Sequence, residues 1–158
     1  MEAMKIVNDL FTGEYEGTCL VKNLYMYDKR KKERAWLICA AHDTAIDMKA
    51  LTKNLGVGSG NLRGGNEDSM WERLGARKGA LTLFAIINDK EKKGIELILD
   101  KRLTEEFKYV GLHPMDNTAT TAISKESVLK IAQLAEHEPK IMDFSGDTAA
   151  AASKPEPK

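Results

Sequence analysis

The residue that first draws attention to chemistry is Lys22, which interrupts the apolar run at residues 19–24. A strand of that composition is expected to have most of its positions buried, so a lysine within it needs a reason. In one interpretation Lys22 faces outward, with its stem along the sheet and its ammonium in water. In the other, it places a point charge at the wall of a cleft, where it could hold a phosphate or a carboxylate.

The densest polar segment covers residues 109–121 and is flanked by strand-like sequence. Within it Gly111 allows a ligand to approach the backbone, Pro114 stiffens the turn, and His113 can donate or accept a proton near neutral pH. A structural turn in which His113 caps a carbonyl explains the same residues. Spacing alone leaves both interpretations open.

Several other kinds of site are not expected. The sequence has no GxSxG motif, no cysteine at a catalytic spacing from a histidine and no paired carboxylates in an apolar frame, so no covalent nucleophile stands out. The three histidines and two cysteines lack short ligand spacings, and we expect neither a metal nor a cofactor. The glycine-rich residues 56–65 lack the order of a nucleotide-binding loop and predict a flexible surface loop.

The composition sets broad limits. The 158 residues are 42% hydrophobic and 30% charged, which is typical of one soluble globular domain, and the formal net charge of zero excludes a strongly basic nucleic-acid-binding protein. Residues 29–34 nevertheless contain five basic residues and one acidic residue. No apolar stretch could span a membrane, and the first residues lack the features of a signal peptide, so we expect a cytoplasmic protein.

Periodicity and turn residues predict an α+β domain with a mixed, mostly antiparallel sheet. Asp47, Asn66 and Ser124 are placed to cap helices. The expected helices cover residues 4–11, 48–55, 67–74 and 125–135. The expected strands form one hairpin from residues 18–27 and 35–41, a second hairpin from 80–87 and 95–99, and further strands at 109–111, 118–123 and 140–144. Both cysteines are expected to be buried thiols.

Residues 110–123, which read VGLHPMDNTATTAI, resemble the GxHP and NTATTAI signature of the prolyl-tRNA editing domain family, the YbaK/ProX-like aminoacyl-tRNA deacylases. Further motifs resemble the family in the same order along the chain. They are KNL at 22–24, DMKAL at 47–51 with LG at 55–56, LG at 74–75 with Gly79, TLF at 82–84, ELILD at 96–100 and HEP at 137–139. The resemblance covers nearly all of residues 4–144.

The resemblance implies a YbaK/ProX-like fold with a barrel-like sheet and surrounding helices. It implies an editing (deacylase) domain over residues 1–145, followed by a flexible Ala/Pro/Lys-rich tail or linker over 146–158. The implied activity is hydrolysis of the ester bond of mischarged tRNA(Pro), closest to the branch that acts on Ala-tRNA(Pro). The domain would act in trans or as the N-terminal domain of a prolyl-tRNA synthetase. Two alternatives stay open: a docking module for tRNA or a synthetase without hydrolytic activity, and a deacylase of Cys- or Ser-tRNA.

The same resemblance assigns expected roles to individual residues. The catalytic residues would be Lys22, Asn23 and His113, with the lysine as the required cation and the asparagine orienting the ester. The substrate pocket would be lined by Gly111, Leu112, Pro114, Gly79 and Thr82. The implied partners are the acceptor end of tRNA(Pro) and a fused or separate prolyl-tRNA synthetase, with no membrane involved.

Overall fold

The computed structural model describes residues 9, 11–89 and 94–145. Most of the expected N-terminal helix over residues 4–11 and the whole tail 146–158 lie outside these residues. No helix in the described ranges is long and apolar enough to cross a membrane.

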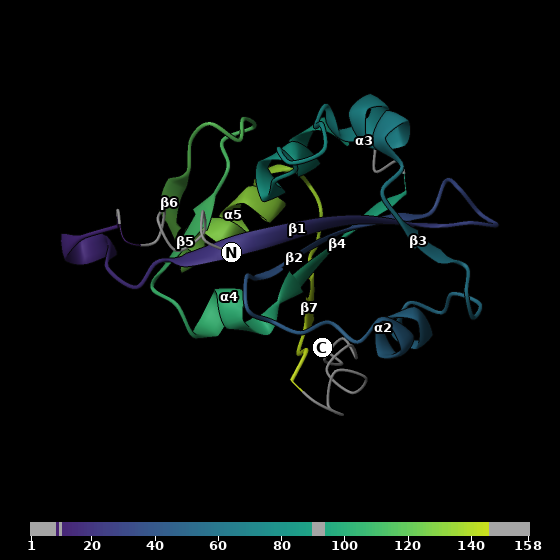
Figure 1. The fold of residues 1–158 in the computed structure, drawn as a ribbon, viewed down its shortest axis with the longest axis horizontal. Coiled ribbons are helices and arrows are strands. Elements are labelled where there is room, and N and C mark those ends of the chain that lie inside the picture. The colour runs from purple at the N-terminus through teal and green to yellow at the C-terminus, as the bar shows by residue number, and fades with distance from the viewer. Residues whose placement is uncertain (1–8, 10, 90–93, 146–158) are drawn as a thin grey trace.

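A seven-stranded mixed sheet forms the centre of the fold (Figure 1). The strands pair in the order β6-β5-β1-β2-β4-β7, and β3 pairs with β1 outside this path. Their bounds are β1 Cys19–Asp28, β2 Ala35–Ala41, β3 Leu62–Gly64, β4 Ile95–Asp100, β5 Tyr109–Leu112, β6 Thr121–Ser124 and β7 Lys140–Met142. The longest pairing, the antiparallel one between β1 and β2, runs through seven residue pairs, which confirms the first predicted hairpin and the mixed α+β class.

The helices begin where the sequence predicts caps. Asp47 accepts hydrogen bonds from two backbone N–H groups at the start of α2 (Met48–Asn54), Asn66 caps α3 (Glu67–Leu74) and Ser124 caps α5 (Lys125–Leu134). The remaining helical segments are η1 (Gly13–Tyr15), η2 (Leu83–Asn88) and α4 (Lys101–Glu105). Gly75, with φ of 62°, ends α3 in the left-handed conformation that glycine adopts readily.

The sheet carries one hydrophobic core on each face, because successive side chains of a strand point to opposite sides. On β2, Leu37 and Cys39 belong to the core under α3, η2, α4 and α5, whereas Trp36 and Ile38 belong to the core under α2. All four side chains are fully buried. Cys19 and Cys39 are free and buried, as predicted.

The second predicted hairpin is wrong. Residues 80–87 do not form a strand, because the chain is extended at Thr82 and then turns into the 3-10 helix η2, which buries Leu83 and Ile86. A short apolar run fits a buried strand and a buried helical turn equally well, so periodicity cannot separate them. β4 instead pairs in parallel with β2 along residues 95–99 and with β7 along residues 98–100.

Two smaller expectations also need correction, and one helix was not expected. The glycine-rich residues 56–65 are not only a loop, since β3 lies within them and pairs with Met26 to Asp28 of β1. The threonine-rich strand begins at Thr121 instead of residue 118. The short helix α4 was not predicted; it is capped by Asp100, whose carboxylate accepts from Arg102 N.

Candidate functional site

β1 and β5 separate soon after they meet, and this split is where the predicted site residues gather. The two parallel strands pair only at Cys19 with Val110 and at Leu20 with Gly111. β3 joins the same edge of β1 at its far end. Among the described residues, no strand pairs with positions 21–24 along this edge. A gap at the carboxyl end of a parallel strand is a common place for a ligand in an open sheet.

The backbone of Asn23 faces this gap. On the opposite side of β1, Leu20 O accepts a hydrogen bond from His42 N at 2.9 Å. Backbone groups alternate between the two edges of a strand in an antiparallel ladder. Val21 and Asn23 therefore direct their N–H and C=O groups to the unpaired edge, where a ligand could bind them.

Lys22 lies half-buried on the face of the sheet that also carries Leu24 and Met26. Its ammonium donates a hydrogen bond to the backbone carbonyl of Thr44, in the turn after β2. An ammonium has three donors, so two remain for oxygen atoms of a ligand. Protein atoms hold this charge against the sheet, which favours the cleft interpretation over a lysine extended into water.

Asn23 projects its side chain to the opposite face, beside Tyr25. Its Oδ1 atom is buried and has no hydrogen-bond partner in the described part of the chain, and the same holds for Oγ1 of the fully buried Thr82 at the start of η2. Buried polar atoms without a partner are rare, and each costs about 1–3 kcal/mol. These two oxygens are the ones that a ligand or an ordered water entering from this face would satisfy.

Gly111 and Leu112 are neighbours on β5, so they also point to opposite faces of the sheet. Gly111 shares the face of Leu20 and Lys22, and a Cβ placed on it would lie 2.8 Å from Leu20 Cδ2 and 3.3 Å from Thr120 Cγ2. Leu112 is buried in the core on the side of Asn23. The glycine at this position therefore lets β5 pack closely against Leu20 and Thr120 on the lysine face.

The loop after β5 is closed by its own hydrogen bonds. His113 Nδ1 lies 3.0 Å from Ala119 O, so the histidine does cap a carbonyl, while its Nε2 makes no hydrogen bond to any described residue. Asp116 Oδ1 accepts from Thr118 N at 2.9 Å, and this bond holds the pKa of Asp116 below its usual range. Pro114 is exposed in this loop. His113 is thus fixed through one nitrogen and free to meet a ligand through the other.

Gly79, in the segment before η2, lies against the loop that follows β5. It adopts a φ of +86°, and a Cβ on it would lie 3.5 Å from Asn117 Nδ2. The two loops therefore lie side by side above the split, as Figure 1 shows between β5 and the segment after α3. The structure brings Gly79, His113 and Gly111 to one end of the sheet, but it places Lys22 and Asn23 on opposite faces of β1.

Neither cysteine is poised as a nucleophile. Cys19 Sγ lies 3.8 Å from His42 Nδ1, but burial raises the pKa of the thiol to about 11. Burial also raises the pKa of Cys39. Since the thiolate is the reactive form, both groups stay protonated near neutral pH. In the ranges that the structure describes, no group of three His, Cys, Asp or Glu side chains could hold a metal ion.

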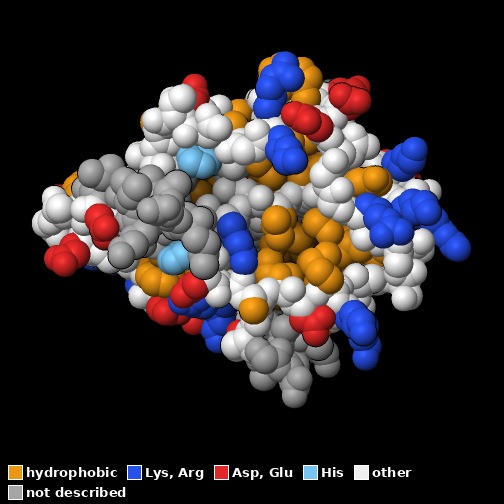
Figure 2. Space-filling model, in the orientation of Figure 1, with side chains coloured by type: hydrophobic (Ala, Val, Ile, Leu, Met, Phe, Trp, Pro, Cys, Tyr) orange, Lys and Arg blue, Asp and Glu red, His pale blue; other side chains and the backbone are white. Residues whose placement is uncertain are grey.

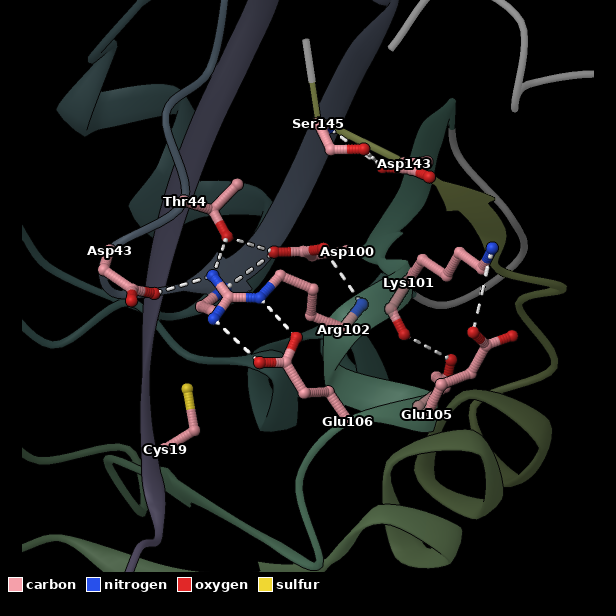
Figure 3. Close-up of polar contacts among 12 residues, drawn as sticks. Cys19, Asp43, Thr44, Asp100, Lys101, Arg102, Glu105, Glu106, Asp143 and Ser145 are labelled. Carbon is pink, nitrogen blue, oxygen red and sulfur yellow. Dashed lines mark hydrogen bonds and ion pairs between the residues drawn. The ribbon is translucent and has the colours of Figure 1, made fainter. Parts of the chain in front are cut away.

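A polar network that the sequence analysis did not identify lies directly behind Thr44 (Figure 3). Asp100 is buried and accepts from Thr44 Oγ1 at 2.6 Å. Arg102 pairs with Asp43 and Glu106, and its hydrogen bonds to these carboxylates hold both of their pKa values below the usual range. The one sequence signal was Asp100, which closes the ELILD motif at residues 96–100 without an assigned role.

Positive charge gathers at the tip of the β1–β2 hairpin, where Lys and Arg side chains project from one end of the molecule (Figure 2). Lys29, Arg30, Lys31 and Lys32 are exposed. Arg34 differs, because it donates to Leu55 O at 3.2 Å and stacks over the ring of Trp36. Four of the five basic residues are therefore available to a polyanion.

A pocket of about 500 Å³ lies apart from the split, beyond the C-terminal end of α5. Its lining includes Leu129, Gln133 and His137. His137 is buried and hydrogen-bonded to Asp89 at 2.9 Å, so it ties η2 to the segment before β7. None of the predicted site residues lines this pocket.

Solved structures share the fold. The hypothetical protein APE2540 superposes with a TM-score of 0.59 at 17% identity, over 84% of this chain and 77% of that protein. A structure from work on epitope backbone grafting onto scaffold proteins superposes with a TM-score of 0.61 at 13% identity, over 80% of this chain and 71% of that one.

Proteins related in sequence identify the family, which the similarity in fold does not. The chain is 39% identical over 124 residues to prolyl-tRNA synthetase associated domain-containing protein 1 of Bos taurus, covering 78% of this chain and 71% of that protein. It is 36% identical over 112 residues to the prolyl-tRNA editing protein ProX of Acetoanaerobium sticklandii, covering 71% of this chain and 65% of that protein. Residues 12–131 match the family described as aminoacyl-tRNA editing domain, and the chain belongs to that family.

Proposed function

We propose that this chain is a deacylase that hydrolyses the ester bond of mischarged tRNA(Pro), with Ala-tRNA(Pro) as the preferred substrate. The observation that carries the proposal is the ammonium of Lys22, which a protein carbonyl holds on the face of the sheet that also carries Gly111, next to the split between β1 and β5. Membership in the aminoacyl-tRNA editing family supplies the substrate class.

The reaction needs no covalent intermediate on the protein. A water oxygen adds to the ester carbonyl, the bond between that carbon and the terminal ribose oxygen breaks, and a proton from the water ends on the ribose oxygen. The products are free alanine and a tRNA with its terminal hydroxyl restored. The high pKa of Cys19 is consistent with attack by water instead of a thiolate.

Lys22 would meet the negative charge that develops on the carbonyl oxygen or hold the terminal phosphate. Asn23 faces the split through its backbone, and we assign it the role of orienting the ester. The free Nε2 of His113 would contact the substrate from the loop above, and the neighbouring ribose hydroxyl would assist, as the family resemblance implies. Approach through the gap lets one substrate reach groups on both faces of β1.

Selectivity would come from the size of the pocket. In the proposal Gly111, Leu112, Pro114, Gly79 and Thr82 line a space that accepts alanine and excludes proline. Overpacking a well-fitted site with a larger side chain costs about 1–3 kcal/mol, whereas a site gains little by attracting a smaller one. The 2.8 Å approach of a Cβ at Gly111 to Leu20 supports a tight wall at this point.

The proposal also covers the domain bounds, the location and the partners of this protein. Residues 1–145 would be the editing unit and residues 146–158 a linker, in a cytoplasmic protein that acts in trans or fused to a prolyl-tRNA synthetase. The acceptor end of tRNA(Pro) would be the contact on the nucleic acid. The near-neutral composition supports a narrow contact, with a synthetase supplying most of the affinity.

The test is a panel of tRNAs charged with alanine, cysteine, serine or proline, incubated with the wild-type protein and with Lys22→Ala. We expect fast release of alanine, little release of proline, and loss of most activity in Lys22→Ala at an unchanged circular dichroism spectrum. Lys49→Ala, which removes an exposed lysine from α2, is the matched control and should keep the wild-type rate. Preferred release of cysteine or serine would reassign the substrate. Binding without any hydrolysis would make the chain a docking module, and near-wild-type turnover in Lys22→Ala would remove the lysine from the mechanism.

A further inference from the structure

We infer that Thr44, fixed by Asp100 and Arg102, is a positioning residue that holds the Lys22 ammonium where the reaction needs it. The inference rests on the proposed function of Lys22. It adds a group of residues that lies far from the signature motif and to which the sequence analysis assigned no role.

Asp100 is the buried member of this hydrogen-bond network, since only 1% of the residue is exposed. Its Oδ2 accepts from Thr44 Oγ1 at 2.6 Å and from Ala41 N at 3.1 Å. Its Oδ1 accepts from Arg102 N at 3.0 Å. Three hydrogen bonds thus satisfy the carboxylate and tie the end of β2 to the end of β4 and the start of α4.

Arg102 closes the same turn from the solvent side. Its Nη1 donates to Asp43 Oδ1 at 2.7 Å and to Thr44 Oγ1 at 3.1 Å. The guanidinium also binds both oxygens of Glu106, at 2.6 and 3.2 Å. Figure 3 shows this guanidinium between the two carboxylates with Thr44 beside it. Planar, bidentate contacts of this kind give a fixed direction as well as attraction.

Thr44 therefore makes hydrogen bonds to two cations, Lys22 and Arg102, and to the buried carboxylate of Asp100. Its hydroxyl has one hydrogen, which goes to Asp100, and its oxygen accepts from Arg102. Its backbone carbonyl accepts from Lys22. Because the side chain is held from two sides, the direction of the carbonyl is fixed as well. The long Lys22 side chain then loses its rotational freedom before a substrate arrives, which is the usual benefit of preorganisation.

The experiment compares Thr44→Val, which keeps the shape and removes the hydroxyl, with Thr44→Ser, which keeps the hydroxyl. We expect single-turnover deacylation to fall roughly 10- to 100-fold in Thr44→Val, the range for a misplaced catalytic group, and to recover most of the wild-type rate in Thr44→Ser. Thr52→Val on α2 makes the same exchange at a hydroxyl that donates to Met48 O and should leave the rate unchanged.

A double-mutant cycle separates positioning from general damage. If Thr44 acts through Lys22, Thr44→Val has no further effect in a Lys22→Ala background, whereas a purely structural loss would multiply with it. As a readout independent of turnover, the NMR order parameter of the Lys22 Nζ group should fall in Thr44→Val and not in Thr52→Val. Arg102→Met, which changes a partly exposed side chain, gives the same two readouts if Thr44→Val does not fold.

Three results would overturn the inference while leaving the proposed function intact. They are a wild-type rate in Thr44→Val, an equal loss in Thr44→Ser and Thr44→Val, and an unchanged order parameter at Lys22. Retained activity in Lys22→Ala would instead overturn the role of the lysine, and the inference with it.

Discussion

Gly111 of β5 and Leu20 of β1 face each other so closely that a Cβ on the glycine would lie 2.8 Å from Leu20 Cδ2. Leu20 is buried, so its side chain has little room to move away. The contact sits at the last residue pair before β5 leaves β1. The two strands are thus closely packed at their last residue pair, directly before they separate around the candidate site.

Gly111→Ala is therefore expected to lower the free energy of unfolding by about 1–3 kcal/mol, the usual effect of overpacking a core. Urea denaturation measures it. Gly64→Ala is the control: it is also on a strand outside the left-handed region, but its nearest neighbour is the flexible Met26 Sδ at 3.3 Å, and we expect a change within about 0.5 kcal/mol. Equal effects in the two variants would contradict the packing argument.

The buried pair of His137 and Asp89 offers a second test. His137 Nδ1 donates to Ala135 O at 2.7 Å and Nε2 lies 2.9 Å from Asp89 Oδ2. Asp89→Ala leaves a buried ring nitrogen without a partner, so unfolding in urea at pH 7 should become easier by about 1–3 kcal/mol. The amide of Asp89→Asn can still form a hydrogen bond with Nε2, so this variant should lose clearly less. Indistinguishable stabilities of the two variants would show that the hydrogen bond contributes little.

Arg102 should affect how the free energy of unfolding changes with pH in the acidic range. Its hydrogen bonds hold the pKa of Asp43 below the ordinary 3.8 and that of Glu106 below the ordinary 4.5. A carboxyl with a lowered folded-state pKa adds stability above its ordinary value, and this stability is lost as the pH falls through the folded-state value. Arg102→Met should thus be less stable than the wild type at pH 6, with a gap that narrows below about pH 4. The gap is small, since these groups are exposed and screened.

Urea denaturation of both proteins between pH 6 and pH 3 measures this gap. A difference that stays constant over the whole range would attribute the effect of Arg102 to packing instead of its charge.

The hairpin tip should contribute to tRNA binding through its charge. Replacing Lys29, Arg30, Lys31 and Lys32 by glutamine leaves Arg34 and its contacts in place. Binding of tRNA(Pro) should weaken, and the slope of log affinity against log salt should become shallower by about one for each phosphate that the tip no longer neutralises. Filter binding at several salt concentrations measures the slope. An unchanged slope would show that the tip is solvated surface only.

Local signals in the sequence predicted much of the fold correctly. The caps at Asp47 and Asn66 follow from side chains that bond backbone groups two or three residues away, and such contacts depend only on nearby sequence. The β1–β2 hairpin was predictable for the same reason, since one short connection joins its strands. The apolar residues 80–87 were assigned incorrectly, because only their packing partners decide between strand and helix.

Neighbouring positions in the chain were enough to identify the family, the candidate residues and most of the elements that carry them, because motifs and caps are local. The directions in which those residues point were not predictable in this way. Contacts between distant segments decide which face of the sheet Lys22 and Asn23 each point to. They also decide where β1 and β5 separate and which groups hydrogen-bond to Thr44. The split and the hydrogen bond between Thr44 and Asp100 form only when the parallel pairings close long loops, and no short window of sequence contains that information.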